Sequence, residues 1–192
     1  MLYSGKDLRK LIIPLIIEQI LAIAVGMADT IMVSAAGEAA VSGVSLVDTV
    51  NILLINVFSA LATGGAVVSG HFLGKKKRED ACKSAWQILL FATLLAFVIS
   101  VIFITAHDPL LRLMFGKIED DVMKASKTYL IITTYSFVAL AIYNSCAALF
   151  RAMNESKVTM WVSLLMNVIN VVGNAICIYA VSYTHLRAHE TG

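Results

Sequence analysis

The sequence predicts an all-α integral membrane protein, because it is strongly apolar, contains long apolar segments and concentrates its basic residues in particular loops. Hydrophobic residues make up 59% of the chain, and the mean hydropathy is +0.82. Soluble domains have a smaller apolar share, about 45–50%. A membrane-spanning helix needs about 20 mostly apolar residues. The segments expected to reach this length are residues 11–33, 45–73, 86–106, 129–150 and 158–180.

The first apolar segment contains two acids, Glu18 and Asp29. An ionised carboxylate near the centre of a bilayer costs about 2.5 kcal/mol or more unless it faces a cavity or a partner. Eleven residues at about 100° each bring Asp29 to within about 20° of Glu18 around the helix, roughly 16 Å further along the axis. One face of this helix is therefore expected to be wet or lined by protein. The segment is too long for the apolar region of a signal peptide, which spans about 7–15 residues.

The second apolar segment, residues 45–73, combines one acid with several glycines. Asp48 is expected in its first turn, where a carboxylate complements the helix dipole, although a binding role for Asp48 is the alternative. A small-residue face that permits close helix packing is predicted in the second half. Its members are Gly64, Gly65, Gly70 and Gly74.

The basic residues alternate between the loops. Three precede the first segment, five follow the second within residues 75–83, and two lie between the fourth and fifth, whereas the first loop has none. Cytoplasmic loops are enriched in Lys and Arg. The pattern predicts a multi-pass protein of the cell inner (plasma) membrane with a cytoplasmic N-terminus. A basic run alone is weak evidence for nucleic-acid binding, so no nucleic-acid partner is expected.

Two further stretches differ from the spanning segments. Asp108 as N-cap and Gly116 as the stop predict a short helix lying on the membrane interface. Residues 181–192 turn polar abruptly and resemble a translated sequencing adapter. We interpret this tail as non-native, and a zinc site at His185 and His189 is rejected for the same reason, so no metal is expected.

The fifth segment carries Asn167, Asn170 and Asn174, which the spacing places on one helix face. Buried amides in hydrocarbon need hydrogen-bond partners. One interpretation is that they hold helices together; the other is that their face and the Asp29 face line one cavity. Four further polar residues are candidates to line such a pathway: Glu18, Gln19, Asn51 and Tyr143.

Enzyme motifs are absent from the sequence, including Walker A, G-x-S-x-G and H-E-x-x-H. No catalytic residues and no cofactor are therefore expected. Carrier chemistry fits better, because a carboxylate in a membrane cavity can lose and regain a proton or bind a cation as its surroundings change.

Several motifs together resemble multidrug and toxic compound extrusion transporters over about residues 7–180. In chain order they are Glu18-Gln19 after Pro14; Gly26-Met27-Ala28-Asp29-Thr30-Ile31-Met32-Val33; Gly64-Gly65 to Gly74 before the basic loop; Arg112-Leu113-Met114-Phe115-Gly116 before Tyr129-Leu130; Phe150-Arg151-Ala152-Met153; and Asn167 with Asn170. Their order and spacing together make the resemblance specific.

The resemblance implies a twelve-helix carrier of two six-helix lobes, which exports organic cations in exchange for protons or sodium ions. It implies that Asp29 is a coupling-ion or substrate site with Asn170 nearby. Asn174 stands where some members have a second acid. The chain would then be most of the N-terminal lobe, inactive alone, with a C-terminal lobe of the same protein as its partner. A lipid-linked sugar flippase of related fold and a non-transporting membrane assembly module are the alternatives.

Overall fold

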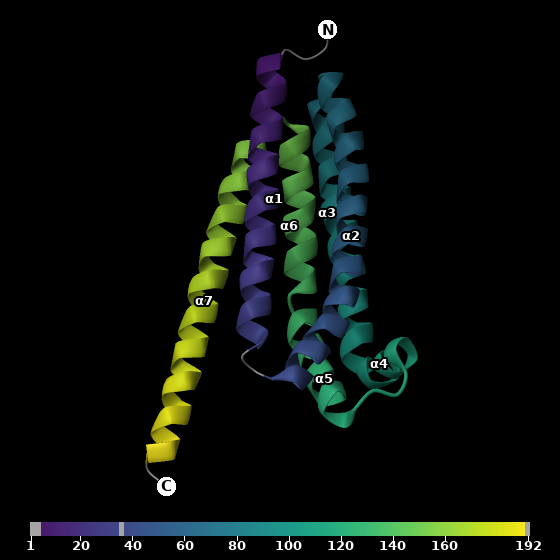
Figure 1. The fold of residues 1–192 in the computed structure, drawn as a ribbon. Coiled ribbons are helices and arrows are strands. Elements are labelled where there is room, and N and C mark those ends of the chain that lie inside the picture. The colour runs from purple at the N-terminus through teal and green to yellow at the C-terminus, as the bar shows by residue number, and fades with distance from the viewer. Residues whose placement is uncertain (1–4, 35–36, 191–192) are drawn as a thin grey trace. The chain divides into compact units, whose positions relative to one another are not determined.

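The computed structural model describes residues 5–34 and 37–190, and these residues are organised into helices (Figure 1). In chain order the helices are α1 (Gly5–Ser34), α2 (Glu38–Gly74), α3 (Arg78–Thr105), α4 (His107–Phe115), α5 (Asp120–Thr134), α6 (Phe137–Ala152) and α7 (Ser156–Glu190). The chain divides into two compact units. One contains α1 and α7, and the other contains α2 to α6.

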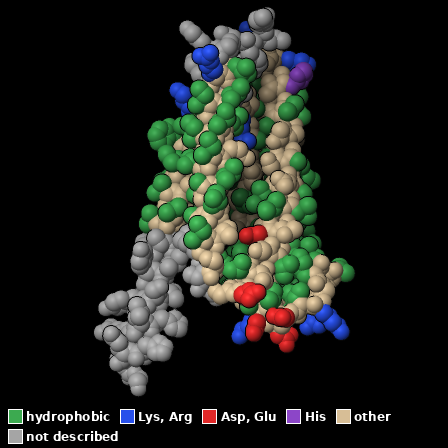
Figure 2. All heavy atoms as spheres, viewed as in Figure 1, with side chains coloured by type: hydrophobic (Ala, Val, Ile, Leu, Met, Phe, Trp, Pro, Cys, Tyr) green, Lys and Arg blue, Asp and Glu red, His purple; other side chains and the backbone are tan. Residues whose placement is uncertain are grey.

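The membrane prediction is confirmed. Among the described residues, four helices are long and apolar enough to cross a bilayer, and α5 with α6 makes a fifth span if this pair, bent by 49°, is counted as one. Long apolar side chains such as Ile23 on α1 and Trp161 on α7 are exposed. Figure 2 shows hydrophobic side chains over the middle of the helices, with most charged side chains near the ends. A hydrocarbon environment explains this distribution.

The helix expected over residues 129–150 is divided in the structure, because the chain bends between α5 and α6. The hydroxyl of Thr133 donates to the Tyr129 carbonyl at 3.0 Å, and that of Thr134 donates to the Leu130 carbonyl at 2.6 Å. The Ser136 hydroxyl then donates to the Thr133 carbonyl at 2.6 Å. Hydroxyls that bond back to helix carbonyls favour bending. Three of them within four residues give a physical reason for the break.

Helix ends differ from the sequence-based expectation at several places. The helix α2 begins at Glu38 rather than 45, so Asp48 lies about 15 Å inside it and is not in its first turn. Asp108 is not the N-cap of α4 either: that position is Ala106, and Asp108 lies in the first turn. Gly116 ends α4 as predicted, with a φ of 68° that favours glycine. In α7 the helix continues through residue 181 to Glu190.

The unit of α2 to α6 is built around α2, which packs against α3, α5 and α6. Its largest core cluster combines Val50, Leu54 and Phe58 of α2 with Phe137 of α6. Small buried residues from α3 and α6 complete the cluster: Ala92, Ala96 and Ala141. Such residues let membrane helices approach closely. Figure 1 shows α2, α3 and α6 running side by side.

Two glycines of α2 mark the tightest helix contacts. A Cβ on Gly65 would lie 2.7 Å from the Cβ of Ile88 in α3. A Cβ on Gly43 would lie 2.9 Å from the backbone nitrogen of Ser126 in α5, whose hydroxyl donates to the Gly43 carbonyl at 3.2 Å. Gly70 has only an ordinary contact, while the space beside Gly64 and Gly74 is open. The predicted small-residue face therefore contributes mainly through Gly65. Gly43, which precedes the predicted segment 45–73, is a second packing position.

Candidate functional site

The first set of candidate residues lies on α1. Asp29 and Glu18 are half-buried, and Gln19 is exposed. Because α1 is a helix from Gly5 to Ser34, the spacing of eleven residues keeps the two acids on the same side of it. The structure thus preserves the polar stripe on an otherwise apolar membrane helix.

The second set lies on α7. Asn167 is half-buried, and its Nδ2 atom is buried without a hydrogen-bond partner among the described residues. Asn170 is exposed, and the side chain of Asn174 lies outside the described residues. A buried amide nitrogen without a partner costs about 1–3 kcal/mol. Asn167 is therefore a donor that a bound molecule or water can satisfy.

The fold brings these two sets into one unit. The helices α1 and α7 pack against each other and run in the same direction, although they are far apart in the sequence (Figure 1). Carboxylate and amide oxygens are ligands for hard cations, and a carboxylate can also carry a proton. The α1–α7 pair thus combines the groups that a cation or proton site requires.

The remaining candidates, Asn51 and Tyr143, belong to the other unit, where both are half-buried on α2 and α6. In that unit the sequence interpretation missed an interaction. The Tyr129 hydroxyl of α5 donates a hydrogen bond of 2.9 Å to Asp48 Oδ1 of α2. The sequence does contain one indication of this interaction: Asp48 is a carboxylate within a long apolar run, where it needs a hydrogen-bond partner.

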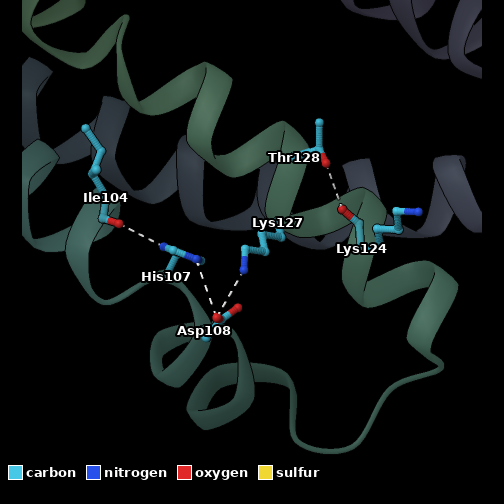
Figure 3. Close-up of polar contacts among 6 residues, drawn as sticks. All are labelled: Ile104, His107, Asp108, Lys124, Lys127 and Thr128. Atoms are coloured by element: carbon cyan, nitrogen blue, oxygen red, sulfur yellow. Dashed lines mark hydrogen bonds and ion pairs between the residues drawn. The ribbon is translucent and has the colours of Figure 1, made fainter.

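A polar cluster of Asp108, Lys127 and His107 joins the short helix α4 to α5 (Figure 3). Lys127 Nζ donates to Asp108 Oδ2 at 3.1 Å, and His107 Nε2 lies 3.5 Å from the same oxygen. The other ring nitrogen of His107 lies 2.8 Å from the Ile104 carbonyl oxygen. The hydrogen bond from Lys127 lowers the pKa of the Asp108 carboxyl below its ordinary value of 3.8. The cluster therefore connects α4 to the first half of α5.

Acidification is expected to break the ion pair between Asp108 and Lys127. Because the folded-state pKa of Asp108 is lowered, its stabilising contribution is fully present above the unfolded-state pKa and is lost as the pH falls through the folded-state pKa. In K127M the pKa of Asp108 should rise toward 3.8. A carboxyl ¹³C NMR titration in detergent measures the shift. K124M is the matched control, because the Lys124 side chain is exposed on the same helix. Equal midpoints in wild type and K127M would contradict the assignment.

Comparison with known proteins identifies the family. The family model described as MatE matches residues 14–176, which is most of the chain. The chain belongs to the MatE family. Residues 14–176 include α2 to α6 complete, together with Asp29 on α1 and the three asparagines on α7. The match ends before residue 181, where the polar tail begins.

Curated relatives agree with the MatE assignment. The chain is 30% identical over 167 residues to an uncharacterized transporter, YisQ, of Bacillus subtilis, covering 86% of the chain and 36% of that protein. It is 27% identical over 176 residues to a probable multidrug resistance protein, NorM, of Halalkalibacterium halodurans, covering 92% of the chain and 38% of the relative. The chain thus spans little more than a third of the length of these relatives.

Solved structures show the same fold as this MatE chain. One is described as the outward-facing conformation of a multidrug resistance MATE family transporter of the MOP superfamily, and it matches with a TM-score of 0.84 at 23% identity, covering 92% of this chain and 39% of the other. A MATE structure in a bent conformation matches with a TM-score of 0.81 at 21% identity, covering 93% of this chain and 40% of the other. The all-helical membrane fold is therefore that of MatE transporters.

Proposed function

We propose that this chain is the larger part of the N-terminal lobe of a secondary antiporter, which exports organic cations in exchange for protons or sodium ions. The observation that carries the proposal is Asp29, a half-buried carboxylate on an apolar helix of a MatE chain. A relative named as a probable multidrug resistance protein supports the choice of substrate class. Asp29 is the site at which the coupling ion, or the cationic substrate, binds.

Exchange follows from the electrostatics of a single carboxylate. A negative charge in a medium of low dielectric constant attracts a proton, a sodium ion or an organic cation, and only one of them can neutralise it at a time. Binding of the coupling ion therefore releases the substrate. Asn167 and Asn170 of α7 supply neutral oxygen and N–H groups beside α1, which orient the bound species without cancelling the charge.

The direction of transport depends on the second lobe of the complete protein. Repeat-built carriers alternate access by moving one lobe against the other around a site near the membrane midplane. The distribution of Lys and Arg supports a cytoplasmic N-terminus in the inner (plasma) membrane. In this orientation Asp29 lies in the outer half of the membrane.

A transport assay tests the proposal directly. The full-length protein is reconstituted into liposomes loaded with a fluorescent organic cation such as ethidium, and an inward pH or sodium gradient is imposed. We expect efflux with one of the two gradients and none when an ionophore collapses that gradient. Absence of gradient-driven cation movement with both ions would overturn the proposed antiport.

Asn170→Ala is expected to weaken transport less than a change at Asp29. Loss of one amide contact to a charged species costs about 1.5–3 kcal/mol, which corresponds to roughly a tenfold or greater increase in the coupling-ion concentration needed for half-maximal transport. Asn56→Ala is the matched control, because Asn56 is an exposed asparagine on α2 in the other unit. An unchanged ion dependence in Asn170→Ala would assign Asn170 to helix packing alone.

A further inference from the structure

A second carboxylate lies inside the unit of α2 to α6, and its surroundings resemble a small-cation site. Asp48 is half-buried on α2, about 15 Å from the start of the helix. It is the only acid of α2 beyond Glu38. A carboxylate in this position requires compensation for the water that it loses.

Neutral hydrogen-bond donors provide part of that compensation. The Tyr129 hydroxyl donates to Asp48 Oδ1 at 2.9 Å, and Asn51 Nδ2 donates to the same oxygen at a longer distance of 3.4 Å. Neither donor carries a charge. Within the described side chains, no Lys, Arg or His forms an ion pair with Asp48. The negative charge of the group is therefore not neutralised by these neighbours.

An unsatisfied oxygen beside Asp48 points to the missing charge. Asn51 Oδ1 is buried and has no hydrogen-bond partner among the described residues. A buried carbonyl oxygen without a donor is costly, and a bound metal cation satisfies such an oxygen as a donor would. Carboxylate, amide and hydroxyl oxygens are also ligands that hard cations accept.

Apolar residues packed near Asp48 limit access of water. Val47, Leu111 and Leu130 form a buried cluster, and Tyr129 packs against it. Val47 directly precedes Asp48 in the sequence, and Leu130 directly follows Tyr129. Electrostatic attraction between a carboxylate and a cation is stronger in such surroundings than in water.

We infer that Asp48, Asn51 and Tyr129 form a second binding site for a small monovalent cation, Na⁺, between α2 and α5. Asp48 supplies the charge, Asn51 supplies its amide oxygen, and Tyr129 holds the carboxylate in place or contributes its own oxygen. The site is separate from Asp29 on α1, and it does not require that Asp29 bind an ion. It also connects α2 to the element that precedes the bend at Tyr135 and Ser136.

Direct ion binding tests this inference on the purified full-length protein in detergent. Equilibrium binding of ²²Na⁺ is measured for wild type, D29N, D48N and the double variant. We expect D48N to lose one Na⁺ per protein relative to wild type, and D29N to retain the site that D48N removes. Y129F keeps the carboxylate but removes one hydrogen bond to it, and should weaken Na⁺ binding at this site about fivefold or more. D108N is the control, because Asp108 is an exposed acid outside the spanning helices.

A thermal-shift measurement separates binding from a purely structural role. Wild type should unfold at a higher temperature in NaCl than in choline chloride. This difference in unfolding temperature between the two salts should be smaller in D48N than in wild type. A D48N protein that binds as much ²²Na⁺ as wild type, with the same affinity, overturns the inference. The inference is also overturned if D48N lowers the unfolding temperature, relative to wild type, by the same amount in NaCl and in choline chloride. D29N separates this inference from the proposed function. If D29N loses transport but still binds the Na⁺ that D48N removes, the result supports both the transport role of Asp29 and a separate Na⁺ site at Asp48.

Discussion

Asp29→Asn in the full-length transporter is expected to reduce cation efflux to the background of cells that lack the protein. Asparagine has nearly the same shape as aspartate, but it carries no charge and cannot take up a proton. A site that depends on one carboxylate then loses its attraction for both the coupling ion and the cationic substrate. We expect a loss of about 100-fold or more, since several kcal/mol of electrostatic binding energy are removed in a medium of low dielectric constant.

Ethidium efflux from cells and the drug concentration that inhibits growth measure this effect. Membrane expression is checked by immunoblotting, because the loss must not reflect failed insertion. Asp80→Asn is the control, because Asp80 is an exposed acid outside the proposed site. Its Oδ2 atom lies 3.9 Å from Lys77 Nζ near the basic loop. Efflux at the wild-type level in Asp29→Asn would refute the assignment of Asp29, whatever the result at Asp48.

Gly65→Leu is expected to destabilise the unit of α2 to α6. Even a Cβ at this position would lie 2.7 Å from Ile88 Cβ, which is attached to the α3 backbone and cannot rotate away. The two helices must move apart, and overpacking of this kind costs about 1–3 kcal/mol or more. We expect a fall of several degrees in the unfolding temperature.

The neighbouring residue provides a matched control. Gly64→Leu makes the same chemical change one position earlier in α2, and the space beside Gly64 is open. Both variants gain the same helix propensity, so their difference isolates the contact with Ile88. Fluorescence-detected size-exclusion chromatography after heating compares them in detergent. Equal unfolding temperatures for the two variants would show that α2 and α3 do not meet closely at Gly65.

The apolar segments could be predicted from the sequence because length and hydropathy determine which segments cross a bilayer. The positions at which the helices begin and end could not be predicted in the same way. Residues 38–44 are small and only moderately apolar, so a hydropathy pattern places the start of α2 at 45, whereas the chain is helical from Glu38. The bend at Tyr135 depends on hydroxyls that bond back to carbonyls, which an apolar pattern does not report.

The candidate site was predictable to a similar extent. Glu18, Asp29 and the asparagines stand out because polar residues in apolar helices are costly and therefore informative. Asp48 was misread as a residue of the first helical turn, which followed from the misplaced start of α2. Its bond to Tyr129 joins residues far apart in the sequence. Such a pairing depends on how α2 and α5 pack, and no local pattern contains it.

The pairing of α1 with α7 bears on how the chain enters the membrane. Residues 35–155 separate the two helices. At about 5–20 residues per second, a ribosome needs on the order of ten seconds to make this interval. During that time α1, with its two acids, has been synthesised while its partner has not. We therefore expect α1 to settle stably in the bilayer only late in synthesis, and until then to be the segment most accessible to membrane proteases that remove incompletely inserted chains.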